Sequence, residues 1–90
     1  MFTEHDYDEI IRWKKQEYNI NGWNEMVLNA KEFMEEVSDE CMNVEAAANA
    51  MIKNMLEGDR FVIDPENRHS EELTVCYYCD NLSESRRRIF

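Results

Sequence analysis

The sequence predicts a mixed α+β fold: three amphipathic helices followed by a two-stranded antiparallel β-hairpin and a short basic C-terminal tail. Three observations lead to this fold class. Apolar residues recur every three or four positions in three segments before Gly58, which is the spacing of one helix face. Beyond Gly58 they alternate, as in a strand with one buried face. Only two glycines and one proline interrupt the 90 residues, so the segments are clearly separated.

The first helix is expected over residues 3–18. Thr3 is its expected N-cap, and Asp6 stands at the capping-box distance from it. Its apolar stripe consists of Tyr7, Ile10, Ile11 and Tyr18, and Lys14 interrupts it. The run Asn19-Ile20-Asn21-Gly22 ends this helix, because Asn and Gly tolerate the left-handed backbone conformation.

The second helix is expected over residues 22–39, with Asn21 as its N-cap. Its apolar residues follow helical spacing closely: Trp23, Met26, Val27, Ala30, Phe33, Met34 and Val37. The third helix is expected over residues 44–57, capped by Asn43 and ended by Gly58. We expect four methionines to fill the core: Met26, Met34, Met51 and Met55.

The two strands of the hairpin are expected over residues 60–64 and 72–79, joined by a polar loop around Pro65. In the second strand Leu73, Val75 and Tyr77 alternate with Thr74, Cys76 and Tyr78, so Tyr77 and Tyr78 are expected on opposite faces. A hairpin alone is marginally stable in water, so it must pack on the helices or pair with another chain. The tail covers residues 80–90.

Length and charge limit the possible functions. Ninety residues predict one domain over residues 1–90, and 20 acidic against 10 basic side chains give a net charge of −10. Such a charge argues against direct binding to nucleic acids or anionic membranes, whose phosphates it repels. We see no secretory signal and no apolar run of membrane-spanning length, so we expect a cytoplasmic protein.

Motifs for catalysis are sparse, and we expect neither an enzyme nor a cofactor. His5 and His69 are the only histidines, and no glycine-rich phosphate loop or nucleophile motif is present. The CxxC formed by Cys76 and Cys79, with His69 nearby, is half of a zinc site, but no second half stands out. We interpret these cysteines as reduced and partly buried, and a CxxC zinc module remains an alternative.

The acidic residues of the second helix form the most informative pattern. Glu32, Glu35, Glu36, Asp39 and Glu40 lie three or four positions apart, which places them in one stripe on a helix. One interpretation is a solvated face that keeps a small protein soluble. The other is a row of carboxylates that mimics a nucleic-acid backbone and occupies a basic groove of a partner. Tyr78 is the expected exposed anchor beside it.

These features are similar to those of a type of protein. Small, acidic, glycine-poor domains without catalytic motifs resemble phage and mobile-element proteins that block nucleic-acid machinery, such as anti-restriction and anti-CRISPR proteins. The resemblance implies a DNA-mimic inhibitor whose partner is a protein with a basic surface. The alternative is a small structural or regulatory oligomer, for example a homodimer, whose acidity only confers solubility. Arg86, Arg87 and Arg88 are expected to pair with the acidic stripe of this chain or with that of a second copy.

Overall fold

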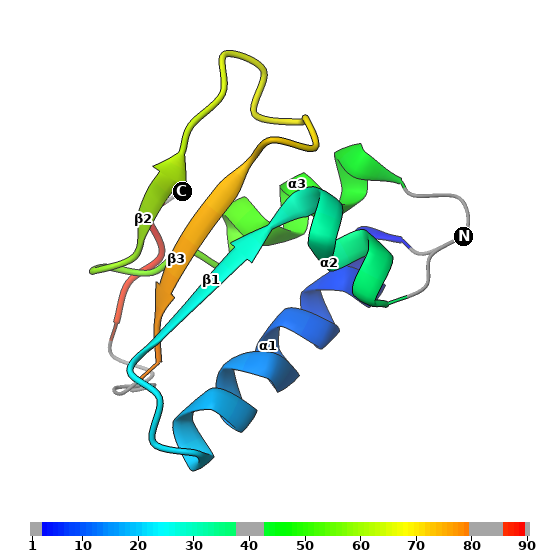
Figure 1. Cartoon of the computed structure of the whole chain (residues 1–90). Coiled ribbons are helices and arrows are strands. Elements are labelled where there is room, and N and C mark those ends of the chain that lie inside the picture. Colours follow the sequence, from blue (N-terminus) through cyan, green and yellow to red (C-terminus); the bar gives the residue numbers. More distant parts are fainter. Residues whose placement is uncertain (1–2, 38–42, 80–85, 90) are drawn as a thin grey trace.

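The structure, a computed structural model, describes residues 3–37, 43–79 and 86–89. In chain order its elements are α1 (Glu4–Ile20), β1 (Glu25–Asn29), α2 (Ala30–Glu36), α3 (Val44–Lys53), β2 (Arg60–Ile63) and β3 (Thr74–Tyr78). The three strands form one antiparallel sheet in the order β1-β3-β2, with β3 in the centre (Figure 1). The fold is therefore mixed α+β.

The predicted order of three helices followed by a two-stranded hairpin is wrong. The segment predicted as one helix over residues 22–39 contains β1 and then the seven-residue α2. Met26 and Leu28 are buried while Val27 between them is 59% exposed, which is the period of a strand. The helical spacing of the apolar residues there did not decide the structure, because β1 pairs with β3 along its whole length.

The helix caps explain where the chain changes direction. The side chain of Asn29 accepts a hydrogen bond from the backbone N–H of Glu32, so Asn29 is the N-cap of α2. Asn21, predicted as that cap, is instead the C-cap of α1. The predicted caps Thr3 and Asn43 are confirmed, and Thr3 forms a complete capping box with Asp6.

The C-terminal half differs from the prediction mainly in its boundaries. α3 ends at Lys53, with Asn54 as C-cap, and Gly58 (φ +98°) lies in the turn before β2 and does not end the helix. β2 and β3 pair antiparallel as predicted, with an irregularity in register between Phe61 and Ile63. β1 on the other side of β3 supplies the support that a lone hairpin lacks.

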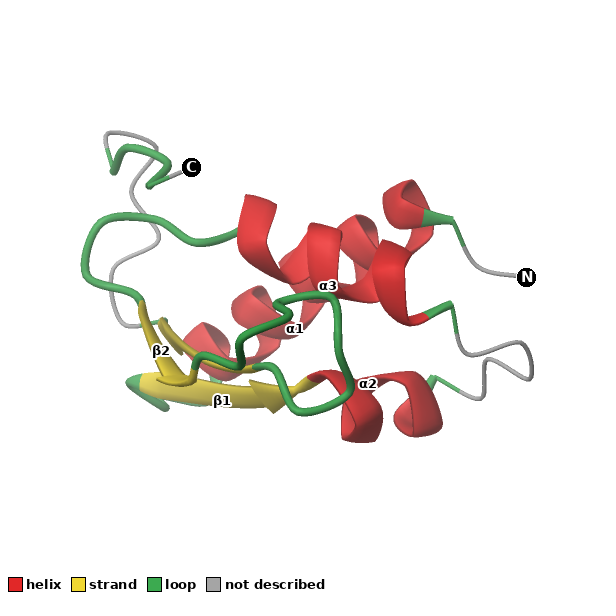
Figure 2. Ribbon diagram, turned by 90° about the horizontal axis from the view of Figure 1, so that it is seen from above, coloured by secondary structure: helices red, strands yellow, loops and turns green. Residues whose placement is uncertain are grey.

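The core lies between the sheet and the three helices. α1 and α3 lie together on one side of the sheet, and α2 continues from the end of β1 (Figure 2). The buried residues include the four methionines predicted for the core, and the phenol of Tyr77 donates a hydrogen bond to the Met51 carbonyl (2.6 Å). Among the described residues, no helix is both long and apolar enough to cross a membrane.

Candidate protein-interaction surface

The face of the sheet opposite α1 and α3 exposes apolar side chains. Residues paired across antiparallel strands point to the same face, so Val27, Cys76 and Arg60 share this face, as do Glu25 and Tyr78. Val27 is 59% and Tyr78 39% exposed. Ile63, paired with Thr74 on the same face, is 49% exposed. We call Val27, Ile63 and Tyr78 the outer sheet face.

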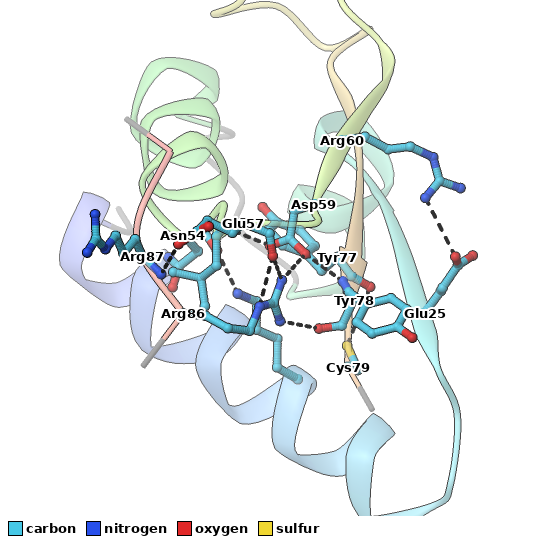
Figure 3. A network of polar contacts seen from close by, with 12 residues as sticks. Glu25, Asn54, Glu57, Asp59, Arg60, Tyr77, Tyr78, Cys79, Arg86 and Arg87 are labelled. Atoms are coloured by element: carbon cyan, nitrogen blue, oxygen red, sulfur yellow. Dashed lines mark hydrogen bonds and ion pairs between the residues drawn. The ribbon is translucent and has the colours of Figure 1, made fainter. Parts of the chain in front are cut away.

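A polar bridge crosses this face. The guanidinium of Arg60 on β2 lies 3.6 Å from the carboxylate of Glu25 on β1, so the pair spans the central strand (Figure 3). Cys76 lies on β3 between these strands and is only 1% exposed. Around these apolar side chains the same face of the sheet therefore also carries one exposed ion pair.

A buried network holds Tyr78 in place. The carboxylate of Asp59 accepts hydrogen bonds from the backbone N–H of Leu56 (2.8 Å), the backbone N–H of Tyr78 (2.7 Å) and the guanidinium of Arg86 (3.0 Å). Arg86 also donates to the carbonyls of Glu57 and Tyr78, at 2.9 Å each (Figure 3). The backbone of Tyr78 is thus fixed at both its N–H and its carbonyl, so its exposed ring projects from a rigid position.

Four exposed carboxylates lie at the other end of β1. The backbone carbonyl of Glu71 accepts from the Asn29 side chain (3.1 Å) and from the Lys31 N–H (3.3 Å), which draws the loop before β3 to the start of α2. Together the loop and α2 carry Glu32, Glu35, Glu71 and Glu72, all exposed. None of the four has an ion-pair partner among the described residues. We call them the acidic edge.

The predicted acidic stripe is only partly present. α2 ends at Glu36, so it carries Glu32, Glu35 and Glu36 alone, and Asp39 and Glu40 lie outside the described residues. The Glu36 carboxylate is 2.5 Å from the ammonium of Lys14, whose side chain is 11% exposed. This pair explains the lysine that interrupts the apolar stripe of α1, and it removes Glu36 from the unpaired carboxylates.

Sequence reasoning missed Glu71 and Glu72, because backbone hydrogen bonds across about forty residues bring them to α2. No local signal could have found them. A signal for the start of α2 was present, since Asn29 followed by Glu32 three positions later has the spacing of an N-cap pair.

The CxxC does not form a metal site with other described residues. Cys76 and Cys79 are buried free thiols, and burial raises the pKa of each, which favours the thiol over the metal-binding thiolate. His69 lies in the exposed loop between β2 and β3. In the part of the chain that the structure describes, no three His, Cys, Asp or Glu residues are placed to hold a metal ion.

The arginines of the tail show one internal pair. Arg86 pairs with the buried Asp59, as predicted for an internal contact, but this acid lies outside the predicted stripe.

No protein-family model matches the chain, nor does any curated protein or solved structure.

Proposed function

We propose that this chain is a non-enzymatic protein-binding module that occupies a basic, nucleic-acid-binding surface of a partner protein. The observation that carries the proposal is the position of the acidic edge beside the outer sheet face. Asn29 and Thr74, paired across β1 and β3 and joined by a side-chain hydrogen bond of 3.1 Å, lie between the two. Apolar anchors and unpaired carboxylates therefore meet on one continuous surface.

Each half of this surface has a physical role in binding. Exposed Tyr78 and Val27 offer contact area whose burial stabilises a complex, and a rigid tyrosine loses little entropy on binding. The carboxylates attract a basic partner over a distance of roughly 8–10 Å at physiological salt and accelerate its association. They also repel acidic surfaces, which gives specificity. In the phosphate-binding groove of the partner, these carboxylates would take the place of the nucleic-acid phosphates.

In this proposal the chain acts as an inhibitor of the DNA-mimic type, as in anti-restriction and anti-CRISPR proteins of phages and mobile elements. The partner then releases its nucleic acid when the chain binds. Because the chain only has to fill a groove, no catalytic residue is required of it.

The test is competition for a partner. The full chain is immobilised and exposed to proteins that were first retained on DNA-cellulose. A true partner is retained at low salt and is released by excess duplex DNA, because both ligands need the same groove. Retention of proteins that DNA does not displace, or retention indifferent to salt, contradicts the proposal.

Two variants of equal charge make the test specific. The first removes three of the four charges of the acidic edge by Glu35→Gln, Glu71→Gln and Glu72→Gln. The second removes the same charge elsewhere by Glu17→Gln, Glu45→Gln and Glu66→Gln, at positions that also lack a described ion-pair partner. The first should weaken retention at least tenfold relative to the second. Equal weakening would show that only net charge matters.

One observation favours a second function, a homodimer. β1 and β2 are the edge strands of the described sheet, and exposed edges can pair with another chain. In such a dimer the outer sheet face would pack against the outer sheet face of the second copy, and the negative charge would only confer solubility. Light scattering separates the two functions: a monomer at millimolar concentration excludes the dimer, whereas a dimer dissociated by Val27→Lys favours it.

A further inference from the structure

A groove runs between one face of α1, the end of α3 and residues 86–89. It is open to solvent and has a volume of about 540 Å³. Five of the ten basic residues of the chain line it: Arg12, Lys15, Lys53, Arg86 and Arg88. The two carboxylates in its lining belong to Glu4 and Asp8, so five positive against two negative charges give +3 with His5 neutral. This is a local reversal of charge in a chain of net charge −10.

Three of the five basic side chains already have acidic partners. Lys53 pairs with Glu4 (2.5 Å), Arg12 with Asp8 (3.3 Å) and Arg86 with Asp59 (3.0 Å). Lys15 and Arg88 have no ion-pair partner among the described residues. In residues 3–37, 43–79 and 86–89, these two cations of the groove therefore lack a carboxylate within ion-pair distance.

Of the two cations Lys15 and Arg88, Lys15 is unusual because it is buried. It is only 7% exposed, its ammonium donates to the Asn54 carbonyl (2.6 Å), and it lies 4.6 Å from the centre of the Tyr77 ring. An ammonium has three N–H donors, and a buried charge is costly unless an opposite charge accompanies it. Burial lowers the pKa of Lys15, and the negative charge of Asp59 opposes this shift.

We propose that this groove binds the phosphate group of a small phosphate ester, with Lys15 as the buried counter-charge and Arg88 at the rim. A phosphate monoester carries a charge of about −1.5 to −2 at neutral pH, which matches two cations without a described ion-pair partner better than a single carboxylate does. The groove exceeds the size of a phosphate ion and lies within the range of small-molecule sites, which leaves room for the organic part of the ester.

The repulsion expected from the net charge of the whole chain does not prevent this binding. Exposed charges farther away than roughly 8 Å are largely screened at physiological salt, so a small anion in the groove senses mainly the lining. The proposal concerns residues outside the acidic edge and is independent of the proposed protein partner.

The experiment is an NMR titration of the ¹⁵N-labelled full chain at constant ionic strength. The probes are inorganic phosphate, a nucleoside monophosphate and, as a carboxylate control, succinate. We expect saturable shifts confined to residues 12–16, 53–56 and 86–89 with both phosphate probes, and none with succinate. A tighter fit of the nucleoside monophosphate assigns the ester as ligand, and equal or tighter binding of inorganic phosphate overturns the ester in favour of the free ion.

Three variants complete the test. Arg88→Gln, at an exposed position, should weaken binding of the ester about tenfold, because it removes one charge-assisted contact. Lys15→Met should abolish it while removing the buried charge. Lys31→Gln on α2 changes net charge equally, far along the chain from the groove residues, and should leave binding unchanged. Absence of saturable shifts, equal binding of succinate, or equal weakening by Lys31→Gln and Arg88→Gln would overturn the proposal.

Discussion

The two faces of the sheet use the same strands in different ways. On the inner face Val75 and Tyr77 are fully buried, and the Tyr77 phenol is hydrogen-bonded to α3. On the outer face Tyr78 is 39% and Val27 59% exposed, and the ion pair between Glu25 and Arg60 is open to solvent.

This difference separates stability from binding. Burial of apolar area and satisfied hydrogen bonds on the inner face stabilise the fold, by roughly 25 cal/mol for each Å² of apolar surface removed from water. The exposed side chains of the outer face, such as Val27 and Tyr78, gain little from folding, so they can be changed at small cost to stability. A substitution on one face should therefore affect the free energy of unfolding, and a substitution on the other should affect a partner.

The largest difference is expected between a buried and an exposed ion pair. Asp59→Ala leaves the Arg86 guanidinium without its carboxylate and two backbone N–H groups without an acceptor, so the free energy of unfolding should fall by about 3–5 kcal/mol. Glu25→Ala, on the outer face, should cost about 1 kcal/mol or less. Urea denaturation measures both, and equal losses would contradict the difference between the buried and the exposed ion pair.

The next prediction tests the strand β1 directly. Met26→Ala should destabilise the protein by about 2–5 kcal/mol because it opens a cavity on the inner face. Val27→Thr, one residue further, should change the stability by about 0.5 kcal/mol or less. In the helix first expected over residues 22–39 both side chains belong to the apolar stripe, so comparable losses in the two variants would favour the helix.

Local signals in the sequence were sufficient for part of the fold. Thr3 with Asp6 and Asn43 before α3 mark helix starts because capping depends on residues three positions apart. β1 was missed for the opposite reason. Its apolar residues fit a helix as well as a strand, and pairing with β3, about forty-five residues later, decided between them.

The same distinction applies to the candidate site. Alternation along β3 correctly predicted that Tyr77 and Tyr78 point to opposite faces. The acidic edge and the basic groove are assembled from distant segments, and a count of charges along the chain does not reveal either. The net charge of −10 even argued against a site for phosphate, because an average over the chain conceals a local excess of basic side chains.

Alkaline pH should lower the stability of the fold through three buried groups on and next to β3. Burial raises the pKa of Tyr77 well above its usual value and also raises the pKa of Cys76 and Cys79. The unfolded chain releases these protons from about pH 8.5 for the thiols and about pH 10 for the phenol, whereas the native state keeps them. Their contribution is complete below about pH 8.5 and is lost as the pH rises.

Lys15 acts in the opposite direction. Its lowered pKa means that the native state loses this proton before the unfolded chain does, which adds stability as the pH rises toward 10.5. Cys76, Cys79 and Tyr77 lower the stability as the pH rises, whereas Lys15 alone raises it. The urea midpoint should therefore fall between pH 8 and pH 10.5. Tyr77→Phe should flatten this fall above about pH 10. A rise of the wild-type midpoint over this range would contradict the assignment.

The smallest effect is expected at the acidic edge. Glu35 lies three residues after Glu32 and near the C-terminal end of α2, where both the neighbouring carboxylate and the helix dipole disfavour negative charge. Glu35→Gln should therefore raise the free energy of unfolding by about 0.2–0.5 kcal/mol at low salt. The gain should shrink in about 1 M NaCl, where screening is strong.

Glu17→Gln, on α1, is the matched control for that variant, because it removes the same charge away from α2. A loss of stability in Glu35→Gln would show that the fold uses this carboxylate, which would leave it unavailable to a partner. A gain accompanied by weaker partner retention would instead mean that the chain keeps a charge that opposes its own folding. A gain in stability together with weaker retention indicates that Glu35 serves binding. Solubility does not explain a carboxylate at this position, because Glu17 adds the same negative charge.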